Sequence, residues 1–144
     1  MGITSRNTNR EGHEQGGPPS SRELLIGTTV GVFHGAIALL LWNFFNFENL
    51  LGMLSNEPLY LLYTLTGMFV LGFIPGLLYA KWESISPGLL VGGLLSLSSY
   101  GTWVTIGDGA VPVDPTPFGW YTPLWIGIAV LITVAGWIEV RFSR

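Results

Sequence analysis

Cysteine is absent from the sequence, and charged residues are few. Without cysteine, disulfide bonds and thiolate metal sites are excluded. Only 10% of the 144 residues are Asp, Glu, Lys or Arg, whereas about 25% are charged in an average soluble protein. With 49% apolar residues, a water-soluble fold would expose too much apolar surface. The composition therefore indicates a membrane protein.

Positive charge is also scarce. Lys81 is the only lysine, and the net charge is −3. Binding to nucleic acid and attraction to anionic lipid headgroups both need clustered Lys and Arg. We therefore expect no nucleic-acid partner and no polybasic lipid-binding segment.

Long apolar segments occupy most of the chain. No charged residue occurs from Leu24 to Phe45, a stretch longer than the roughly 20 apolar residues that carry a helix across a bilayer. Three further apolar segments follow. We predict an all-α integral membrane bundle of four transmembrane helices in two hairpins, with helices at about 22–45, 58–80, 87–106 and 122–142.

The residues before the first apolar segment have a different composition. Residues 1–20 are rich in Gly, Asn, Ser, Arg and Glu and contain almost nothing that a core could bury. We expect them to form a disordered cytoplasmic tail, and residues 21–144 to form one transmembrane domain. Ser20 followed by Glu23 is a capping-box pattern, which predicts that the first helix begins near Ser21.

Prolines mark the other helix starts. Pro58, Pro87 and Pro123 each follow a polar residue at the beginning of an apolar segment, and proline is well tolerated in the first helical turn because its missing N–H would have no partner there. Pro75 instead lies inside the second segment, where it removes a hydrogen bond and predicts a kink.

The basic residues predict the orientation, because Lys and Arg are retained on the cytoplasmic side of a membrane. A four-pass arrangement places all six on the side of the two termini: Arg6, Arg10, Arg22, Lys81, Arg141 and Arg144. The opposite side receives acidic residues only, namely Glu48, Glu57, Asp108 and Asp114. We therefore expect a multi-pass protein of the cell membrane with both termini cytoplasmic.

Prolines and glycines are frequent in residues 107–121, between the third and fourth apolar segments. We expect an irregular external loop there, since these residues interrupt helices. Asp108 and Asp114 could ligate a cation, but two carboxylates without further oxygen ligands make a weak site. We therefore expect a solvated loop and no metal site.

Small residues recur on two of the predicted helices. Gly27, Gly31 and Gly35 are four residues apart, which aligns them on one face of the first helix, and Gly88 and Gly92 are aligned in the same way on the third. Small side chains let helix backbones approach closely in a membrane. We expect both faces to pack against other helices. Two such faces exceed what four helices need, so one of them suits self-association or contact with another membrane subunit.

Short matches relate the two halves of the chain. Residues 24–27 read Leu-Leu-Ile-Gly and residues 89–92 read Leu-Leu-Val-Gly, while residues 58–60 match residues 123–125. Both matches are 65 positions apart. A duplicated hairpin would produce them, but leucine-rich segments also match one another by chance, so both explanations stay open.

His34 is the only ionisable side chain well inside a predicted transmembrane helix. Ser96, Ser99 and Thr133 fall at similar depths, so the four side chains could form a polar layer at the middle of the bilayer. An intramembrane histidine can relay protons or bind a ligand. The alternative is a packing role, in which neutral His34 makes one hydrogen bond to a hydroxyl of a neighbouring helix. We favour packing, because acidic partners are absent from the predicted helices.

Missing partner residues exclude most enzyme chemistry. A bis-histidine haem needs a second axial ligand, and the other histidine, His13, lies in the predicted tail. Metal-dependent hydrolysis needs Asp or Glu inside the bundle, and serine hydrolysis needs a carboxylate to orient His34. Glu139 lies near the end of the last helix, where we expect it to pair with Arg22 or Lys81. We therefore predict no catalytic residues, no metal and no cofactor.

Two function classes remain. The first is a non-enzymatic accessory or assembly subunit that acts through helix–helix contacts with a second copy or with another membrane subunit. The second is a small oligomeric transporter or channel with a polar site at His34. A translocation path needs a water-filled polar lane, whereas a docking subunit needs a dry core and an exposed face of small residues.

Overall fold

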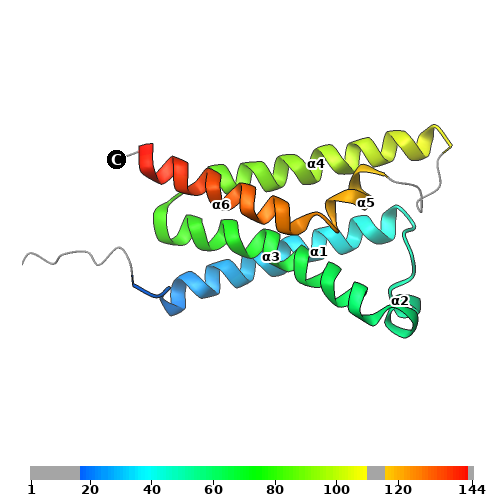
Figure 1. Ribbon diagram of the computed structural model, residues 1–144, viewed down its shortest axis with the longest axis horizontal. Coiled ribbons are helices and arrows are strands. Elements are labelled where there is room, and N and C mark those ends of the chain that lie inside the picture. The colour runs from blue at the N-terminus through cyan, green and yellow to red at the C-terminus, as the bar shows by residue number, and fades with distance from the viewer. Residues whose placement is uncertain (1–16, 110–115, 143–144) are drawn as a thin grey trace, which may run out of the picture.

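The computed structural model describes residues 17–109 and 116–142. These residues form helices and no strands: α1 (Ser21–Phe44), α2 (Leu50–Asn56), α3 (Pro58–Trp82), α4 (Ser86–Gly107), α5 (Pro117–Tyr121) and α6 (Trp125–Phe142) (Figure 1). Four of the helices, α1, α3, α4 and α6, are long and apolar enough to cross a membrane. The predicted all-α class with four candidate membrane-spanning helices is confirmed.

Local sequence signals explain most helix starts. The Ser20 hydroxyl accepts a hydrogen bond from the Glu23 N–H, and the Glu23 carboxylate accepts one from the Ser20 N–H, so the predicted capping box is present. Pro58 and Pro87 lie in the first turns of α3 and α4. The last helix begins at Trp125, later than predicted, because α5 and a turn occupy the preceding residues.

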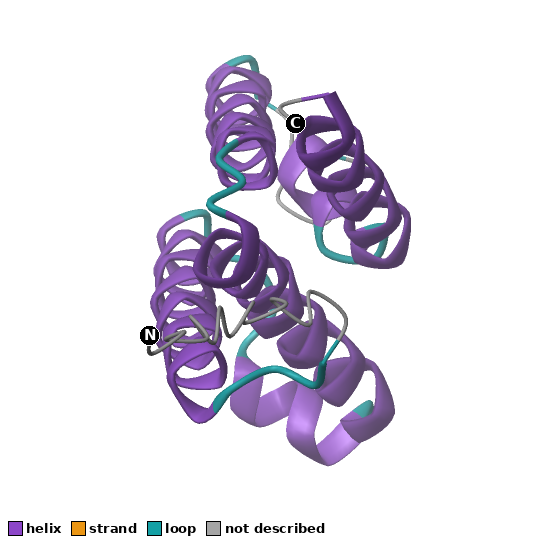
Figure 2. Cartoon of the chain, turned by 90° about the vertical axis from the view of Figure 1, so that its left-hand side faces the viewer, coloured by secondary structure: helices purple, strands orange, loops and turns teal. Residues whose placement is uncertain are grey.

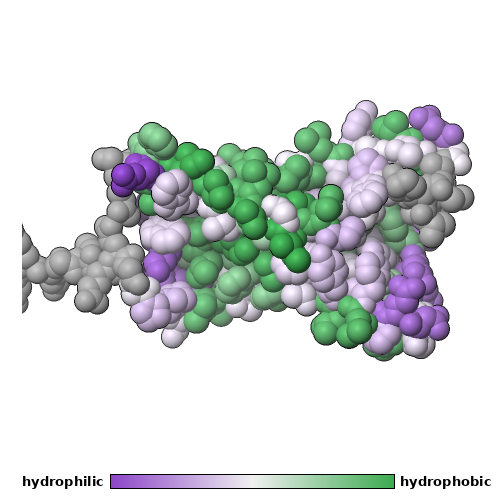
Figure 3. Space-filling view, in the orientation of Figure 1, coloured by the Kyte–Doolittle hydropathy of each residue, from purple (hydrophilic) through white to green (hydrophobic). Residues whose placement is uncertain are grey.

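The charged residues lie at two ends of the molecule. Figure 1 shows the start of α1, the α3–α4 connection and the end of α6 at one end, and α2 and α5 near the other. The first, which we call the basic end, carries all the described basic residues, Arg22, Lys81 and Arg141, together with three glutamates, Glu23, Glu83 and Glu139. The second, the acidic end, carries acidic residues and no described basic one: Glu48, Glu57 and Asp108. A hydrophobic surface separates the two (Figure 3). The other residues of the charge prediction, Arg6, Arg10, Asp114 and Arg144, lie outside the described residues, as do residues 1–16 of the predicted tail.

The long helices form two pairs. Viewed from the basic end, α1 lies beside α3, and α4 lies beside α6 (Figure 2). The α1–α3 interface is the most extensive of the described chain, and α3 also contacts α4 and α6. The core is therefore organised around α3, which joins the first pair to the second.

Glycines from both helices bring α1 and α3 together. A Cβ atom at Gly72 would lie 2.5 Å from the His34 Cβ and 2.7 Å from the Val30 carbonyl oxygen, and one at Gly31 would lie 3.0 Å from the Phe69 carbonyl oxygen. Real Cβ atoms do not approach so closely, so the two backbones touch because side chains are missing. Gly27 and Gly76 lie in the same interface.

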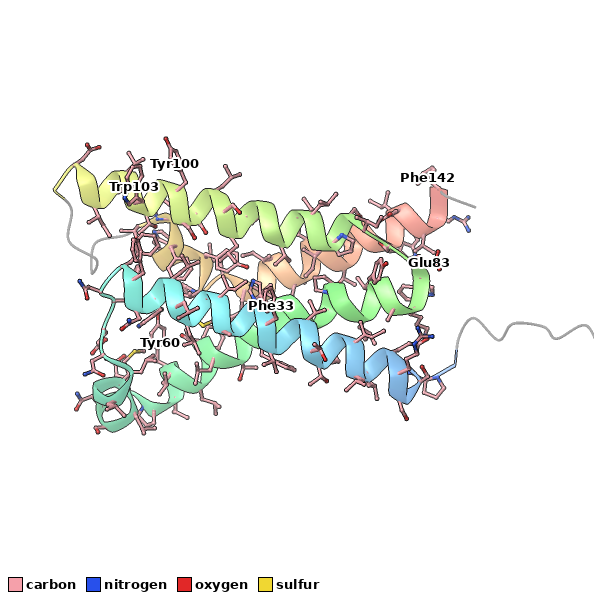
Figure 4. All side chains as sticks on the ribbon, turned by 180° about the vertical axis from the view of Figure 1, so that it is seen from behind. Phe33, Tyr60, Glu83, Tyr100, Trp103 and Phe142 are labelled. Atoms are coloured by element: carbon pink, nitrogen blue, oxygen red, sulfur yellow. The ribbon has the colours of Figure 1, made fainter. Side chains whose placement is uncertain are left out.

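Three glycines of α4 face outward. Ideal Cβ atoms at Gly88, Gly92 and Gly93 would meet no atom of the described chain within 4 Å. We call these three residues the α4 glycine face. Nearer the acidic end, Tyr100 and Trp103 project from α4 away from the other helices (Figure 4). The expected packing of Gly88 and Gly92 is therefore not made by the described residues of this chain.

The segment before α6 is partly buried, which corrects the expected irregular external loop at residues 107–121. Phe118 of α5 is fully buried and Tyr121 is 5% exposed. The Phe118 N–H donates to the Thr102 hydroxyl of α4 at 2.8 Å, and the Phe118 ring packs against Phe45. Proline and glycine indicated a loop, but the aromatic residues between them supply enough apolar surface to fold the segment onto the core. Residues 110–115 lie outside the described residues.

Glu139 of α6 holds the start of α4. Its carboxylate accepts hydrogen bonds from the Ser84 hydroxyl at 2.6 Å and from the N–H groups of Ile85 and Ser86 at 3.1 and 2.9 Å. The first N–H groups of a helix have no partner within the helix, and the N-cap residue of α4 supplies no side-chain cap. Glu139 therefore ties α6 to the α3–α4 connection.

The predicted ion pair of Glu139 with Arg22 or Lys81 is wrong. Its carboxylate is occupied by one hydroxyl and two backbone N–H donors, and hydrogen bonds to an ionised carboxylate are stronger than those between neutral groups. The Lys81 ammonium instead donates to the Gly17 carbonyl oxygen at 2.9 Å. The residues just before α1 are thereby held at the end of α3.

Candidate functional site

His34 lies in the α1–α3 interface, midway along α1. Its side chain is 7% exposed. The Nδ1 atom lies 2.6 Å from the Met68 carbonyl oxygen of α3, and the Nε2 atom lies 3.0 Å from the Tyr121 hydroxyl of α5. One imidazole therefore connects three helices, two from the first half of the chain and one from the second.

Gly72 makes this position available. Met68 precedes Gly72 by one helical turn, and a side chain at Gly72 would occupy the place of the His34 Cβ. Because Gly72 has no side chain, the His34 imidazole can lie against the α3 backbone and reach a carbonyl oxygen there. The site thus depends on the same close approach that holds α1 to α3.

The hydrogen-bond partners assign the histidine tautomer. A carbonyl oxygen can only accept, so Nδ1 donates to Met68, and in the neutral imidazole Nε2 then accepts from the Tyr121 hydroxyl. Burial raises the pKa of the Tyr121 phenol, so its hydroxyl keeps the proton that it donates. Both ring nitrogens of His34 have partners within the protein, which fits a packing role.

The hydroxyls of the predicted polar layer do not gather around His34. Ser96 donates to the Gly92 carbonyl oxygen, and Thr133 donates to that of Ala129, each at 2.7 Å, and both side chains are exposed. Ser99 is partly buried and donates to the Leu95 carbonyl oxygen at 2.7 Å.

These contacts correct the predicted midplane site, which loses three of its four members. Each hydroxyl bonds the carbonyl oxygen one turn earlier in its own helix. A hydroxyl can satisfy itself in this way in apolar surroundings without any partner helix.

Tyr121 is the site residue that the sequence interpretation missed. It was assigned to a loop, and its position 87 residues after His34 gives no local sign of the contact. The available signal was chemical, because a buried histidine needs a hydrogen-bond partner, and the aromatic cluster Phe118, Trp120 and Tyr121 could have supplied one.

Two buried polar atoms lie near this site without a partner among the described residues. They are the Thr64 hydroxyl of α3 and the Trp125 indole N–H of α6. Thr64 precedes Met68 by one turn, and the Trp125 ring lies against Gly67. Buried polar atoms usually have partners, so the α3–α6 contact carries a local cost in stability.

A groove adjoins the site on the other side of the bundle. It measures about 400 Å³. Its lining comes from α4, α5, the turn before α6 and α6 itself, and consists of Leu94, Leu97, Ser98, Pro117, Trp120, Tyr121, Leu124 and Ile128. None of these side chains is charged. Tyr121 therefore borders the groove and holds His34 as well.

Metal-ligating side chains do not cluster in the described ranges 17–109 and 116–142, where no group of three or more His, Cys, Asp or Glu could hold an ion. Comparisons with known proteins give no further information on the site. No family model matches this chain, and no curated protein or solved structure matches it.

Proposed function

We propose that this chain is a four-pass protein of the cell membrane, with both termini cytoplasmic, that serves as a non-enzymatic accessory or assembly subunit. The membrane part is supported by four helices of sufficient length and hydropathy and by the hydrophobic surface between the two ends (Figure 3). The orientation is supported by Arg22, Lys81 and Arg141, which share the basic end.

The α4 glycine face is the observation that carries the subunit proposal. The glycines of α1 and α3 are used in close contact within the chain, whereas Gly88, Gly92 and Gly93 meet nothing within 4 Å. In a membrane, helices associate through faces of this kind because apolar surface alone gives no preference for protein over lipid. A transmembrane helix of a second copy or of another subunit would pack there.

The interior of the bundle supports the same choice over a transporter. His34 is bonded at both ring nitrogens, and Ser96 and Thr133 bond their own helices at the outside. A polar lane through the interior would need such groups to face one another. A transporter would therefore have to form its path between several copies of the chain.

The natural absence of cysteine makes the topology directly testable. Ser55→Cys places a thiol at the exposed acidic end, and Glu83→Cys places one at the exposed basic end. In intact cells, a membrane-impermeant maleimide should label Ser55→Cys, and Glu83→Cys only after permeabilisation. The reverse pattern would contradict the proposed orientation.

The docking role is tested by filling the α4 glycine face. Gly92→Leu should abolish recovery of the partner after mild-detergent extraction, or dissociate the homo-oligomer if the partner is a second copy. Gly127→Leu on α6 is the matched control, because that glycine is also exposed and also meets nothing within 4 Å. Equal assembly of the two variants would refute docking through α4.

The transporter alternative has its own measurement. Vesicles with the reconstituted protein and an internal pH-sensitive dye should show no proton flux, either in the wild type or in His34→Asn, since asparagine cannot take up a proton near neutral pH. A flux that the substitution removes would favour the transporter.

A further inference from the structure

The groove beside Tyr121 is separate from the α4 glycine face. It lies on the flank of α4 that faces α5 and α6, and none of the three glycines of the α4 glycine face lines it. At about 400 Å³ it falls within the size range of small-molecule sites, roughly 300–1,000 Å³. The groove is open to the surface, so an occupant would lie along it rather than be enclosed by it.

The groove opens sideways, between helices that are long and apolar enough to cross a membrane. Leu97 at its rim is 70% exposed, and Trp120 and Leu124 are also exposed. It extends from Pro117 at the acidic end toward Leu94 in the middle of α4. Once α4 and α6 are embedded, the molecules that can enter it from the side are lipids.

The lining excludes a charged headgroup. A phosphate or carboxylate taken out of water needs a cationic partner or several hydrogen-bond donors. The lining has no charged side chain, and most of it is leucine, isoleucine or proline. A neutral molecule fits this surface, with an apolar chain along Leu94, Leu124 and Ile128.

The polar atoms of the lining specify the head of that molecule. The Ser98 hydroxyl gives its proton to the Leu95 carbonyl oxygen at 3.0 Å, which leaves its lone pairs free to accept. The Tyr121 hydroxyl likewise gives its proton to His34. A ligand hydroxyl can donate to Ser98, whereas a carbonyl or ether oxygen can only accept.

We propose that this groove binds a neutral lipid with a hydroxyl head, such as a long-chain or isoprenoid alcohol. The hydroxyl donates to Ser98, and the apolar chain runs between α4 and α6. The occupant also contacts Tyr121, the residue that holds His34. This inference rests on the membrane part of the proposed function and is independent of docking through α4.

Photo-crosslinking in lipid nanodiscs tests the proposal. The probe is a diazirine-bearing isoprenoid alcohol, and labelled peptides are located by mass spectrometry. Labelling should saturate and concentrate on residues 94–98 and 117–128. Unlabelled alcohol should compete about tenfold better than its methyl ether, the factor that corresponds to one hydrogen bond, and better than an anionic phospholipid.

Variants connect the labelling to the groove. Leu97→Trp should fill the groove and remove most of the labelling, and its exposed position makes the change compatible with folding. Leu131→Trp is the control, an exposed residue of α6 outside the lining. Ser98→Ala should keep the labelling but lose the preference for alcohol over ether.

The outcomes separate this inference from the proposed function. Protein that does not float with vesicles would refute the membrane part of the function. Inserted protein whose labelling is unsaturable and spread evenly over all four long helices would overturn the groove site alone. Stronger competition by anionic phospholipid, or equal labelling of Leu97→Trp and Leu131→Trp, would overturn it as well.

Discussion

The two helix pairs use glycine in opposite ways. In the α1–α3 pair, Gly27 and Gly31 meet a helix that carries Gly72 and Gly76, and the backbones close onto one another. In the α4–α6 pair, the α4 glycine face lies in open space, and the close glycine contact is made from the other side, by Gly136 of α6 against the Pro87 side chain. A row of glycines on one helix is therefore not sufficient for close packing, because the facing helix must also have small residues at the matching turns.

The comparison also bears on the origin of the two pairs. At the spacing of 65 positions that relates the short sequence matches, the counterparts of Gly72 and Gly76 are Trp137 and Arg141. These large side chains cannot provide the close approach that α3 provides. Whether the hairpins are duplicated stays open, but only the first has a glycine surface on its second long helix.

Placing the same side chain on both glycine surfaces should give the largest difference in stability between the two helix pairs. Gly72→Leu would drive its side chain into the α1 backbone and should lower the free energy of unfolding by about 3 kcal/mol, the upper part of the usual range for overpacking. Gly92→Leu should change it by less than about 0.5 kcal/mol, as at other open surface positions. Thermal unfolding in mild detergent measures both, and similar losses would mean that α4 is packed after all.

His34 of α1 is hydrogen-bonded to both α3 and α5, so its replacement should lower the free energy of unfolding. His34→Leu leaves the Tyr121 hydroxyl buried without its acceptor and should cost about 2 kcal/mol of unfolding free energy. Phe33→Leu, at an exposed neighbouring position, is the control and should cost far less. The same detergent melting experiment compares them. An unchanged His34→Leu would show that the hydrogen bonds do not contribute to stability.

Tyr121→Phe removes only the hydroxyl and should cost about 1 kcal/mol, the typical value for one hydrogen bond. Combined with His34→Leu it should add little, because both changes break the same contact. Tyr100→Phe provides the control, since that hydroxyl stands on an exposed tyrosine of α4. Additive losses in the double variant would indicate that the two side chains act separately.

The smallest expected effect concerns the glycines that α1 contributes to the α1–α3 interface. A Cβ atom at Gly35 would lie 3.9 Å from the nearest Met68 backbone atoms, an ordinary contact, whereas one at Gly31 would lie 2.8 Å from the Phe69 ring. Gly35→Ala should therefore raise the unfolding free energy by about 0.5 kcal/mol through better helix propensity, and Gly31→Ala should lower it. A gain in both variants would show that α1 and α3 pack less tightly than described.

Features encoded within a few residues were predictable. The Ser20–Glu23 capping box and the starts at Pro58 and Pro87 follow from single helical turns, and the apolar segments give the four long helices. The role of Gly72 was also readable in part, since Gly72 and Gly76 are four residues apart, but their place beside Pro75 suggested a kink rather than an interface.

Contacts between distant parts of the chain were not predictable from one sequence. The Tyr121–His34 bond forms only when α5 folds onto the core. The prolines and glycines around α5 are typical of loops, so the sequence did not predict this folding. The Glu139 prediction considered only charged partners, while the unpaired N–H groups at the start of α4 competed for the same carboxylate. Ser96 and Thr133 were predicted at the same depth as His34, but depth does not determine which way a hydroxyl points.

The bond between His34 and Tyr121 also gives synthesis of this chain an order. The α1–α3 hairpin leaves the ribosome first, and the Nε2 atom of His34 lacks its hydrogen-bond donor until Tyr121, 87 residues downstream, has followed. Until α5 arrives, the hairpin holds a half-satisfied polar group at its surface. A buried acceptor without its donor costs free energy, so the α1–α3 hairpin reaches its full stability only after α5 has folded onto it.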